Sequence, residues 1–115
     1  MDERLERALE FANYRITLSN QKRNIRTRMQ ILQTVHYNKG SFLADPITIG
    51  LVNALISAGK TAGIMVDTKE NPINIEDLQD FQNTLIESYT EASNEYKVQI
   101  DKVNKARNIK KLMDW

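Results

Sequence analysis

Two long stretches without glycine or proline, one near each end of the chain, most constrain what this sequence can fold into. In residues 75–112 the larger apolar positions recur every three or four residues, at Leu78, Phe81, Leu85, Tyr89, Ala92, Tyr96, Ile100, Val103 and Ala106. This spacing predicts one helix with an apolar stripe close to a coiled-coil seam. At about 1.5 Å per residue the helix would be roughly 50 Å long or more, so it needs a partner of similar length.

Residues 2–34 can supply that partner, because they too contain mostly good helix formers. They carry two apolar stripes in place of one. The first consists of Leu5, Leu9, Ala12 and Ile16, and the second of Phe11, Tyr14, Leu18, Ile25, Met29 and Leu32. Two stripes predict a helix that is buried over a wide arc or that contacts two neighbours.

The charges indicate how the two predicted helices meet. The segment from Glu76 to Glu95 contains six acidic residues and no basic one, whereas the segment from Lys97 to Lys111 contains six basic residues and one acidic residue. In the first helix, four acidic residues lie before Phe11 and a basic cluster lies late. An antiparallel arrangement sets opposite charges side by side, and such a pattern selects orientation although each exposed pair contributes only about 0–1 kcal/mol.

The middle of the chain, residues 35–74, predicts a small α/β knob. A β-hairpin is expected over 35–43, with Gly40 available for a positive φ. Asp45 and Pro46 are typical of a helix N-cap and first helical position, and Gly59 of a helix end.

Within that short helix, Ile47, Leu51, Leu55 and Ala58 recur at helical spacing. Residues 64–66 are expected to form a buried strand that returns over 72–75, and Asn74 is expected to cap the second long helix. The predicted fold class is therefore mainly α (α+β): a long antiparallel two-helix hairpin with a knob of two β-hairpins and one short helix. It forms a single domain, 1–115, with 113–115 as a tail.

The composition narrows the class of protein. Of the 115 residues, 41% are hydrophobic and 27% are charged, the formal net charge is +1, and cysteine is absent. This composition argues against a disordered chain, a membrane protein, a disulfide scaffold and thiol catalysis. The N-terminus has no apolar core of a signal peptide, so a cytoplasmic location is expected.

No motif in the sequence specifies a reaction. Gly59-Lys60-Thr61 ends like a phosphate-binding loop, but the first glycine of that motif is replaced by Ala54. His36 is the only histidine, so a histidine-based metal site or proton relay lacks a second member. We therefore expect no catalytic residues, no cofactor, no metal and no small-molecule substrate.

Binding to protein is the better expectation, because the apolar stripes exceed what a two-helix hairpin can cover. The expected interface consists of Phe11, Tyr14, Leu18, Ile25, Leu112, Met113 and Trp115, with Leu5, Leu9 and Ile16 as the other face that could stay exposed. The terminal Leu112, Met113 and Trp115 either dock on the N-terminal region or contact another chain. A possible nucleic-acid patch consists of Lys22, Arg23, Arg26 and Arg28.

Several segments resemble small proteins encoded by T-even-type tailed phages and their marine relatives. The resemblance rests on Phe11–Tyr14, Asn20–Lys22, Gly40–Phe42, Asp67, Asn71–Ile73, Ile75–Gln82 and Asn94–Tyr96. It implies a structural or morphogenetic phage protein, of the prohead-core kind, with no catalytic residues to carry over. Two long antiparallel helices bridged by β-hairpins also resemble the prefoldin chaperone subunit, from which the predicted helix after Asp45 departs.

The sequence thus leads to three hypotheses. The first is a non-enzymatic phage assembly or interaction protein that forms a homo-oligomer or docks on a larger complex, in the host cytoplasm or on a virion or prohead. The second is a nucleic-acid-binding or host-transcription-modulating accessory protein that uses the basic patch. The third is a prefoldin-like chaperone subunit, and an enzyme is a further option, for which the sequence contains no motif.

Overall fold

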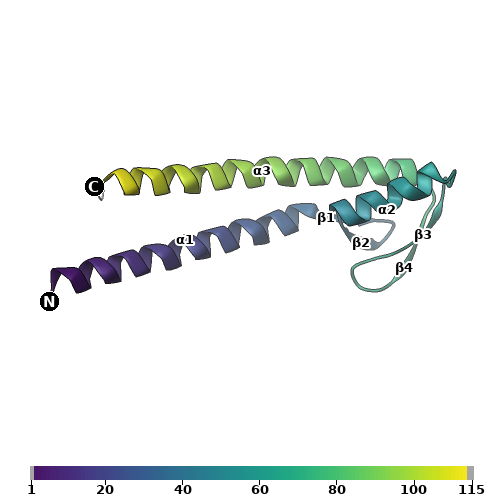
Figure 1. The fold of residues 1–115 in the computed structure, drawn as a ribbon. Coiled ribbons are helices and arrows are strands. Elements are labelled where there is room, and N and C mark those ends of the chain that lie inside the picture. The colour runs from purple at the N-terminus through teal and green to yellow at the C-terminus, as the bar shows by residue number, and fades with distance from the viewer. Residues whose placement is uncertain (1, 114–115) are drawn as a thin grey trace. The chain divides into compact units, whose positions relative to one another are not determined.

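The computed structural model describes residues 2–113, with the side chains of residues 2–106. Its elements follow one another as α1 (Glu3–Gln33), β1 (Thr34–Tyr37), β2 (Gly40–Leu43), α2 (Pro46–Ser57), β3 (Gly63–Val66), β4 (Pro72–Ile75) and α3 (Leu78–Met113) (Figure 1). The predicted fold class is confirmed: the chain is mainly helical, and two antiparallel β-hairpins and a short helix lie between two long helices.

The chain divides into two compact units. The first, here called the helical unit, holds the chain up to Arg28 and from Tyr96 onward. The second, the knob unit, spans Met29–Glu95 and contains the last turns of α1, both hairpins, α2 and the first half of α3.

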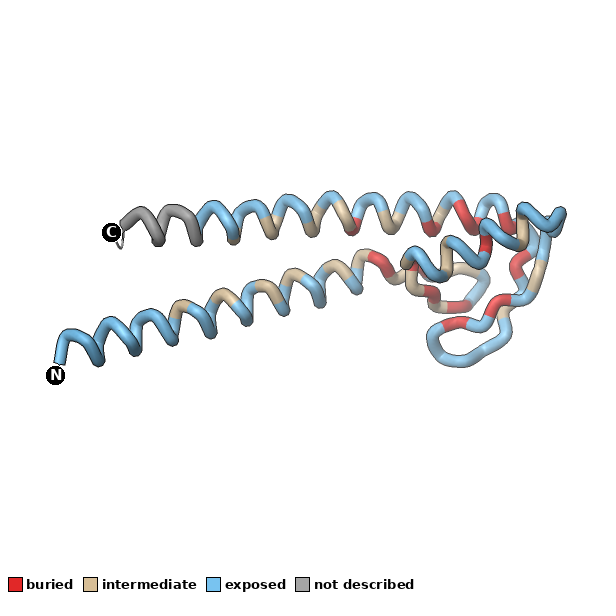
Figure 2. Tube along the Cα trace, in the orientation of Figure 1, coloured by how far each residue is buried: buried red, intermediate tan, exposed pale blue. Residues whose placement is uncertain are grey.

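The hydrophobic core belongs to the knob unit (Figure 2). Phe81 of α3 is fully buried, with its ring centroid 4.8 Å from that of Phe42 and 5.0 Å from that of Tyr37. Such tilted and edge-on contacts add to the free energy gained from burying the rings. The core cluster is completed by Val35, Ala44, Val52, Met65, Ile75, Leu78 and Leu85.

Hydrogen bonds in the knob unit show the direction of α3 relative to the end of α1 and strand β1. The Ser88 hydroxyl donates to the Leu32 carbonyl at 2.6 Å, and the Tyr37 hydroxyl donates to Asp80 Oδ2 at 2.8 Å. Going forward from Leu32 to Tyr37, the partner moves backward along α3 from Ser88 to Asp80. The end of α1 and strand β1 are therefore antiparallel to the first half of α3.

The first hairpin turns one residue earlier than the sequence predicts. Asn38 and Lys39 both have positive φ, 48° and 68°, as a two-residue turn between twisted strands requires. Gly40 instead opens β2 and is buried, and a Cβ on it would lie 2.6 Å from Ile73 Cγ1. The expectation of a positive φ at Gly40 is wrong: glycine is needed there because the second hairpin packs directly against it.

Helix α2 has the predicted ends. Asp45 accepts the Thr48 amide at 2.8 Å and Pro46 follows it, while Gly59, at φ 87°, ends the helix. The amides of Gly59 and Lys60 donate to the carbonyls of Ile56 and Leu55, which is the Schellman pattern. Gly59-Lys60-Thr61 is thus the end of a helix and the start of a loop, without the strand-to-helix geometry of a phosphate-binding loop.

The face of α2 that packs on the core contains Val52, Ile49, Leu55 and Ile56. Ile47 and Leu51 recur at helical spacing with Leu55 but lie away from the core, since they are 83% and 52% exposed. Because α2 is apolar nearly all round, its sequence fits two different core faces, and periodicity alone does not choose between them.

Helix α3 begins at Leu78, after Ile75 has completed β4. Its N-cap is Asp77, whose carboxylate accepts the Asp80 amide at 3.1 Å. The expectation that Asn74 caps this helix is wrong, because Asn74 is paired with Ile64 inside the second hairpin.

Candidate interaction surfaces

Few described side chains are arranged for catalysis. No group of three or more His, Cys, Asp or Glu among the described residues could hold a metal ion. The nearest approach to a catalytic pair is Tyr37 with Asp80. The pKa of Tyr37 is raised to about 12 by the hydrogen bond of its hydroxyl to Asp80, by its partial burial and by the nearby carboxylates. A phenol held neutral in this way is a donor that links β1 to α3.

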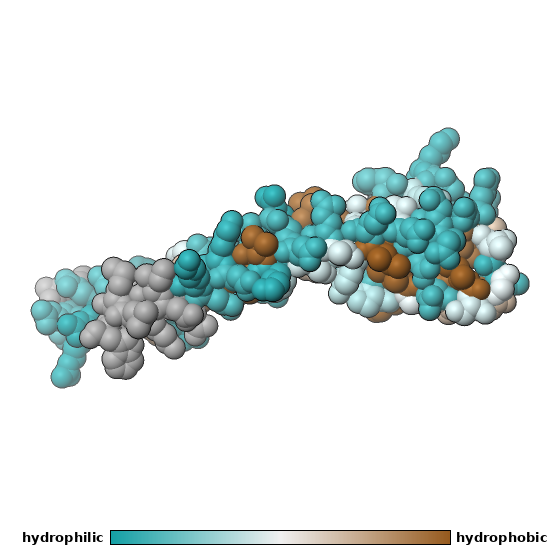
Figure 3. Space-filling view, turned by 90° about the horizontal axis from the view of Figure 1, so that it is seen from above, coloured by the Kyte–Doolittle hydropathy of each residue, from teal (hydrophilic) through white to brown (hydrophobic). Residues whose placement is uncertain are grey.

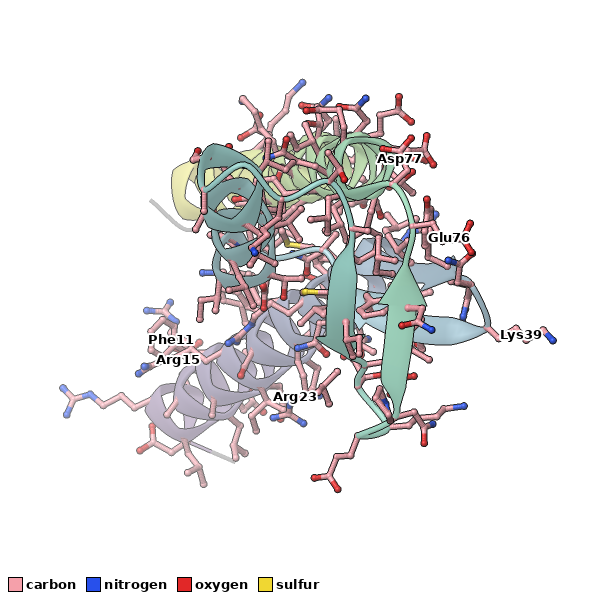
Figure 4. The ribbon with its side chains drawn as sticks, turned by 90° about the vertical axis from the view of Figure 1, so that its right-hand side faces the viewer. Phe11, Arg15, Arg23, Lys39, Glu76 and Asp77 are labelled. Carbon is pink, nitrogen blue, oxygen red and sulfur yellow. The ribbon has the colours of Figure 1, made fainter. Side chains whose placement is uncertain are left out.

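The acidic and basic side chains at the turns of the knob point outward. Figure 4 shows Lys39 at the tip of the first hairpin and Glu76 and Asp77 before α3. Lys39 and Glu76 border a shallow, open depression together with Asn38, Pro72, Ile73 and Asn74. Its lining has no buried polar side chain directed at a ligand, so we assign no site to it.

Helix α1 has apolar side chains on two opposite faces. At about 100° per residue, Leu5, Leu9 and Ile16 share one face and Tyr14, Leu18 and Ile25 the other. The second set is half-buried within the chain, whereas Leu5, Leu9 and Ile16 are 51%, 47% and 59% exposed. We call Leu5, Leu9 and Ile16 the uncovered face of α1.

The predicted interface residues therefore differ in how far they are exposed. Phe11 lies on the same side of α1 as Tyr14 but is 61% exposed, and the Arg15 guanidinium lies 5.9 Å from the centre of its ring (Figure 4). This is a solvent-exposed cation–π contact. The side chains of Leu112 and Met113, and all of Trp115, lie outside the described residues. Whether these residues bind another chain stays a prediction.

The predicted nucleic-acid patch lies near the end of α1 in the helical unit. At about 100° per residue, Lys22, Arg23 and Arg26 occupy about a third of the helix circumference, and Arg28 points to a different side. Arg23, Arg26 and Arg28 are exposed and Lys22 is half-buried. The ion pairing expected between α1 and α3 also stays a prediction; the Lys97–Asp101 pair links two residues of α3 itself.

A third surface, which the sequence analysis missed, is an apolar groove between α2 and β3 in the knob unit. Its exposed apolar members are Ile47 and Leu51 of α2 and Ile64 and Val66 of β3. The expectation that 64–66 is a buried strand is wrong for two of its three residues, since Ile64 and Val66 are 66% and 65% exposed and only Met65 is buried. Figure 3 shows such apolar surface (brown) interrupting the polar surface of the knob.

The sequence did contain a signal for this groove. Ile47 and Leu51 are four residues apart, as neighbours on one helix face are, and Ile64 and Val66 are two apart, as neighbours on one strand face are. The groove has a volume of about 370 Å³, and the buried residues Phe42 and Met65 also line it.

Comparison of the chain with protein-family models, with curated protein sequences and with solved structures finds no match. Among the described residues, no helix combines the length and apolar character that crossing a bilayer requires. Function is therefore inferred from the exposed surfaces of α1 and of the α2–β3 groove.

Proposed function

We propose that this chain is a non-enzymatic assembly protein that forms homo-oligomers through the uncovered face of α1. One observation supports this proposal above all: α1 is apolar on two opposite faces, and the chain half-buries only one of them. The phage context, with an assembly role in the cytoplasm of an infected bacterium, is part of the proposal and rests on the sequence resemblance.

The proposed partner is a second copy, because the spacing of the face suits a like helix. Leu5, Leu9, Ala12 and Ile16 follow one another at intervals of four, three and four residues, the pattern of a coiled-coil seam. Fully burying a Leu or Ile contributes about 1.5–3 kcal/mol, and these side chains are already about half-covered. Three of them from each of two copies thus contribute roughly 5–9 kcal/mol before the cost of association. We expect a weak, concentration-dependent oligomer.

Sedimentation velocity from about 5 to 500 μM would test this proposal. The average mass of the wild-type chain should rise over this range, and the double variant Leu9→Gln/Ile16→Gln should stay monomeric. Val98→Gln is the matched control, because Val98 is 47% exposed, as Leu9 is, but lies on α3. A wild-type monomer at 500 μM, or a double variant that associates like the wild type, would overturn the proposal.

Nucleic-acid binding remains the second candidate, favoured by the gathering of Lys22, Arg23 and Arg26 on one side of α1. Fluorescence anisotropy with a labelled duplex should then show affinity that falls steeply with salt. Arg23→Gln/Arg26→Gln should lose the binding, whereas Lys102→Gln/Lys105→Gln, two exposed lysines of α3, should retain it. Equal binding by both variants would remove this candidate.

A further inference from the structure

The two outer edges of the second hairpin differ in how their backbone groups are satisfied. On β4, Pro72 has no amide hydrogen to offer, and the carbonyl of Asn74 accepts a hydrogen bond from the Asn38 side-chain amide at 2.8 Å. A proline and a capped carbonyl are devices that stop another strand from pairing with an edge. The β4 edge is therefore protected.

The phase of the ladder shows which groups face outward from β3. The Asp67 amide donates to the Asn71 carbonyl at 2.9 Å, so this pair is bonded across the hairpin. Bonded pairs alternate with non-bonded ones in an antiparallel ladder, so Ile64 and Val66 belong to non-bonded pairs. Asn74, opposite Ile64, has its carbonyl turned outward to Asn38, which agrees with this phase. The N–H and C=O groups of Ile64 and Val66 consequently point out of the free edge of β3.

Nothing in the sequence of β3 protects this edge. The strand reads Gly-Ile-Met-Val, with no charge and no proline, and its two outward side chains are about two-thirds exposed. An apolar, unpaired edge is a template for another strand.

The α2–β3 groove is suited to an uncharged occupant. Its walls carry Ile47 and Leu51 on α2 and the exposed side chains of β3. The one ionisable side chain in its lining is Asp67, and this carboxylate already accepts the backbone amides of Ser41, Lys69 and Asn71 at 2.8–3.1 Å. A charged segment would find no counter-charge in the groove, and a polar one would lose its hydration there.

We propose that the free edge of β3 binds an extended, uncharged segment of a partner protein as an added strand, with alternate apolar side chains in the α2–β3 groove. Main-chain hydrogen bonds to Ile64 and Val66 hold the segment, and the groove selects its side chains. Since β3 has four residues, about 13 Å at the rise of a strand, the bound part is about four residues long. This binding uses residues of the knob unit and is independent of the proposed oligomerisation through α1.

The test uses the full chain labelled with ¹⁵N and the peptide acetyl-Lys-Thr-Val-Thr-Val-Thr-Lys-amide, in which Val and Thr favour extended backbone and the lysines keep the peptide soluble. Titration should shift the amide resonances of Ile64 and Val66 with sub-millimolar affinity. A matched peptide with N-methyl groups on alternate central amides keeps the side chains but loses donors, and it should bind at least tenfold more weakly. Equal binding of the two peptides, or no shift at millimolar concentration, would overturn the proposal.

Two protein variants locate the binding. Ile64→Lys places a charge beside the free edge and should weaken peptide binding at least tenfold. Ile31→Lys makes the same change at an isoleucine that is 68% exposed on α1, close to the 66% of Ile64, and should leave binding unchanged. Loss of binding in both variants would overturn the assignment to β3.

A second copy of the chain is the competing occupant. If the amides of Ile64 and Val66 shift with protein concentration in the absence of peptide, and Ile64→Lys removes this dependence, β3 pairs with itself and the proposed partner segment is wrong. The Leu9→Gln/Ile16→Gln variant should bind the peptide as the wild type does, so the failure of either proposal leaves the other testable.

Discussion

The two units of this molecule hold themselves together in different ways. The knob unit contains every residue of the core cluster, and hydrogen bonds tie β1 and the end of α1 to α3. In the helical unit, none of the described residues is buried (Figure 2). Long helices without a buried core gain little free energy from packing, and most helical stability in proteins comes from packing an apolar face. Core packing therefore stabilises the knob unit, whereas the proposed association is what would add buried apolar surface to the helical unit.

The largest expected effect comes from removing the centre of the core. Phe81→Ala should destabilise the knob unit by about 3–5 kcal/mol, because it deletes a fully buried ring that contacts Phe42 and Tyr37. Leu9→Ala in the helical unit should change the free energy of unfolding of the monomer by less than about 1 kcal/mol. Urea unfolding followed by circular dichroism at low protein concentration would compare the two. Similar losses in both variants would contradict the division into a packed and an unpacked unit.

The next effect concerns two glycines that the same substitution should affect in opposite directions. Gly40→Ala should destabilise the knob unit by about 1–3 kcal/mol, because the new Cβ would lie 2.6 Å from Ile73 and 2.9 Å from Phe42. Gly50→Ala lies in the middle of α2, and apart from the two neighbouring residues and the backbone of its own helix no atom lies within 4 Å of the new methyl group. This substitution should stabilise the knob unit by about 0.5–1 kcal/mol. Thermal unfolding measures both changes. A destabilised Gly50→Ala variant would show that α2 is packed more closely than described.

Acid should weaken the knob unit through Asp67. Backbone amides, first that of Asn71 and then that of Ser41, lower the pKa of this carboxyl group below its ordinary value of 3.8. A lowered pKa in the folded state means that the stabilisation is present above the unfolded value and is lost as the pH falls below about 4. The melting temperature should therefore drop between pH 5 and pH 2, and less so in Asp67→Asn. Parallel pH profiles for the two proteins would argue against this role of Asp67.

Alkali should have the smallest of these effects, through Tyr37. Its pKa is raised to about 12, so its stabilisation is present below the ordinary value of 10 and is lost as the pH rises toward 12. Tyr37→Phe should cost about 1 kcal/mol at neutral pH, because one hydrogen bond to an exposed carboxylate is lost. Absorbance at the phenolate band would follow the titration, and a Tyr37 that titrates near 10 would contradict the contact with Asp80.

The sequence was most informative where one residue type has one physical use. Asp45-Pro46 and Gly59 located both ends of α2, because a carboxylate N-cap, a fixed φ and a positive φ are local requirements. Gly40 misled for the opposite reason: the turn next to it could use Asn38 and Lys39, and the need for glycine came from Ile73, 33 positions away in the printed sequence.

Choosing between apolar faces was beyond the sequence. Both stripes of α1 were visible, but which one the chain half-buries depends on how the rest of the molecule packs. Likewise, Ile64, Met65 and Val66 form an apolar run that fits a strand buried on one face or on both. At the exposed candidate surfaces, the local sequence pattern is that of a buried face, but the packing of the whole chain leaves the residues exposed.

The free edge of β3 also has a consequence for chains that bind no partner. Because β4 occupies the other edge of β3 and is itself protected, two molecules that meet at this strand could pair only once, and a third copy would find no free edge at which to continue the stack. Concentrated samples should therefore give no cross-β fibre pattern with its spacing of about 4.7 Å along the fibre.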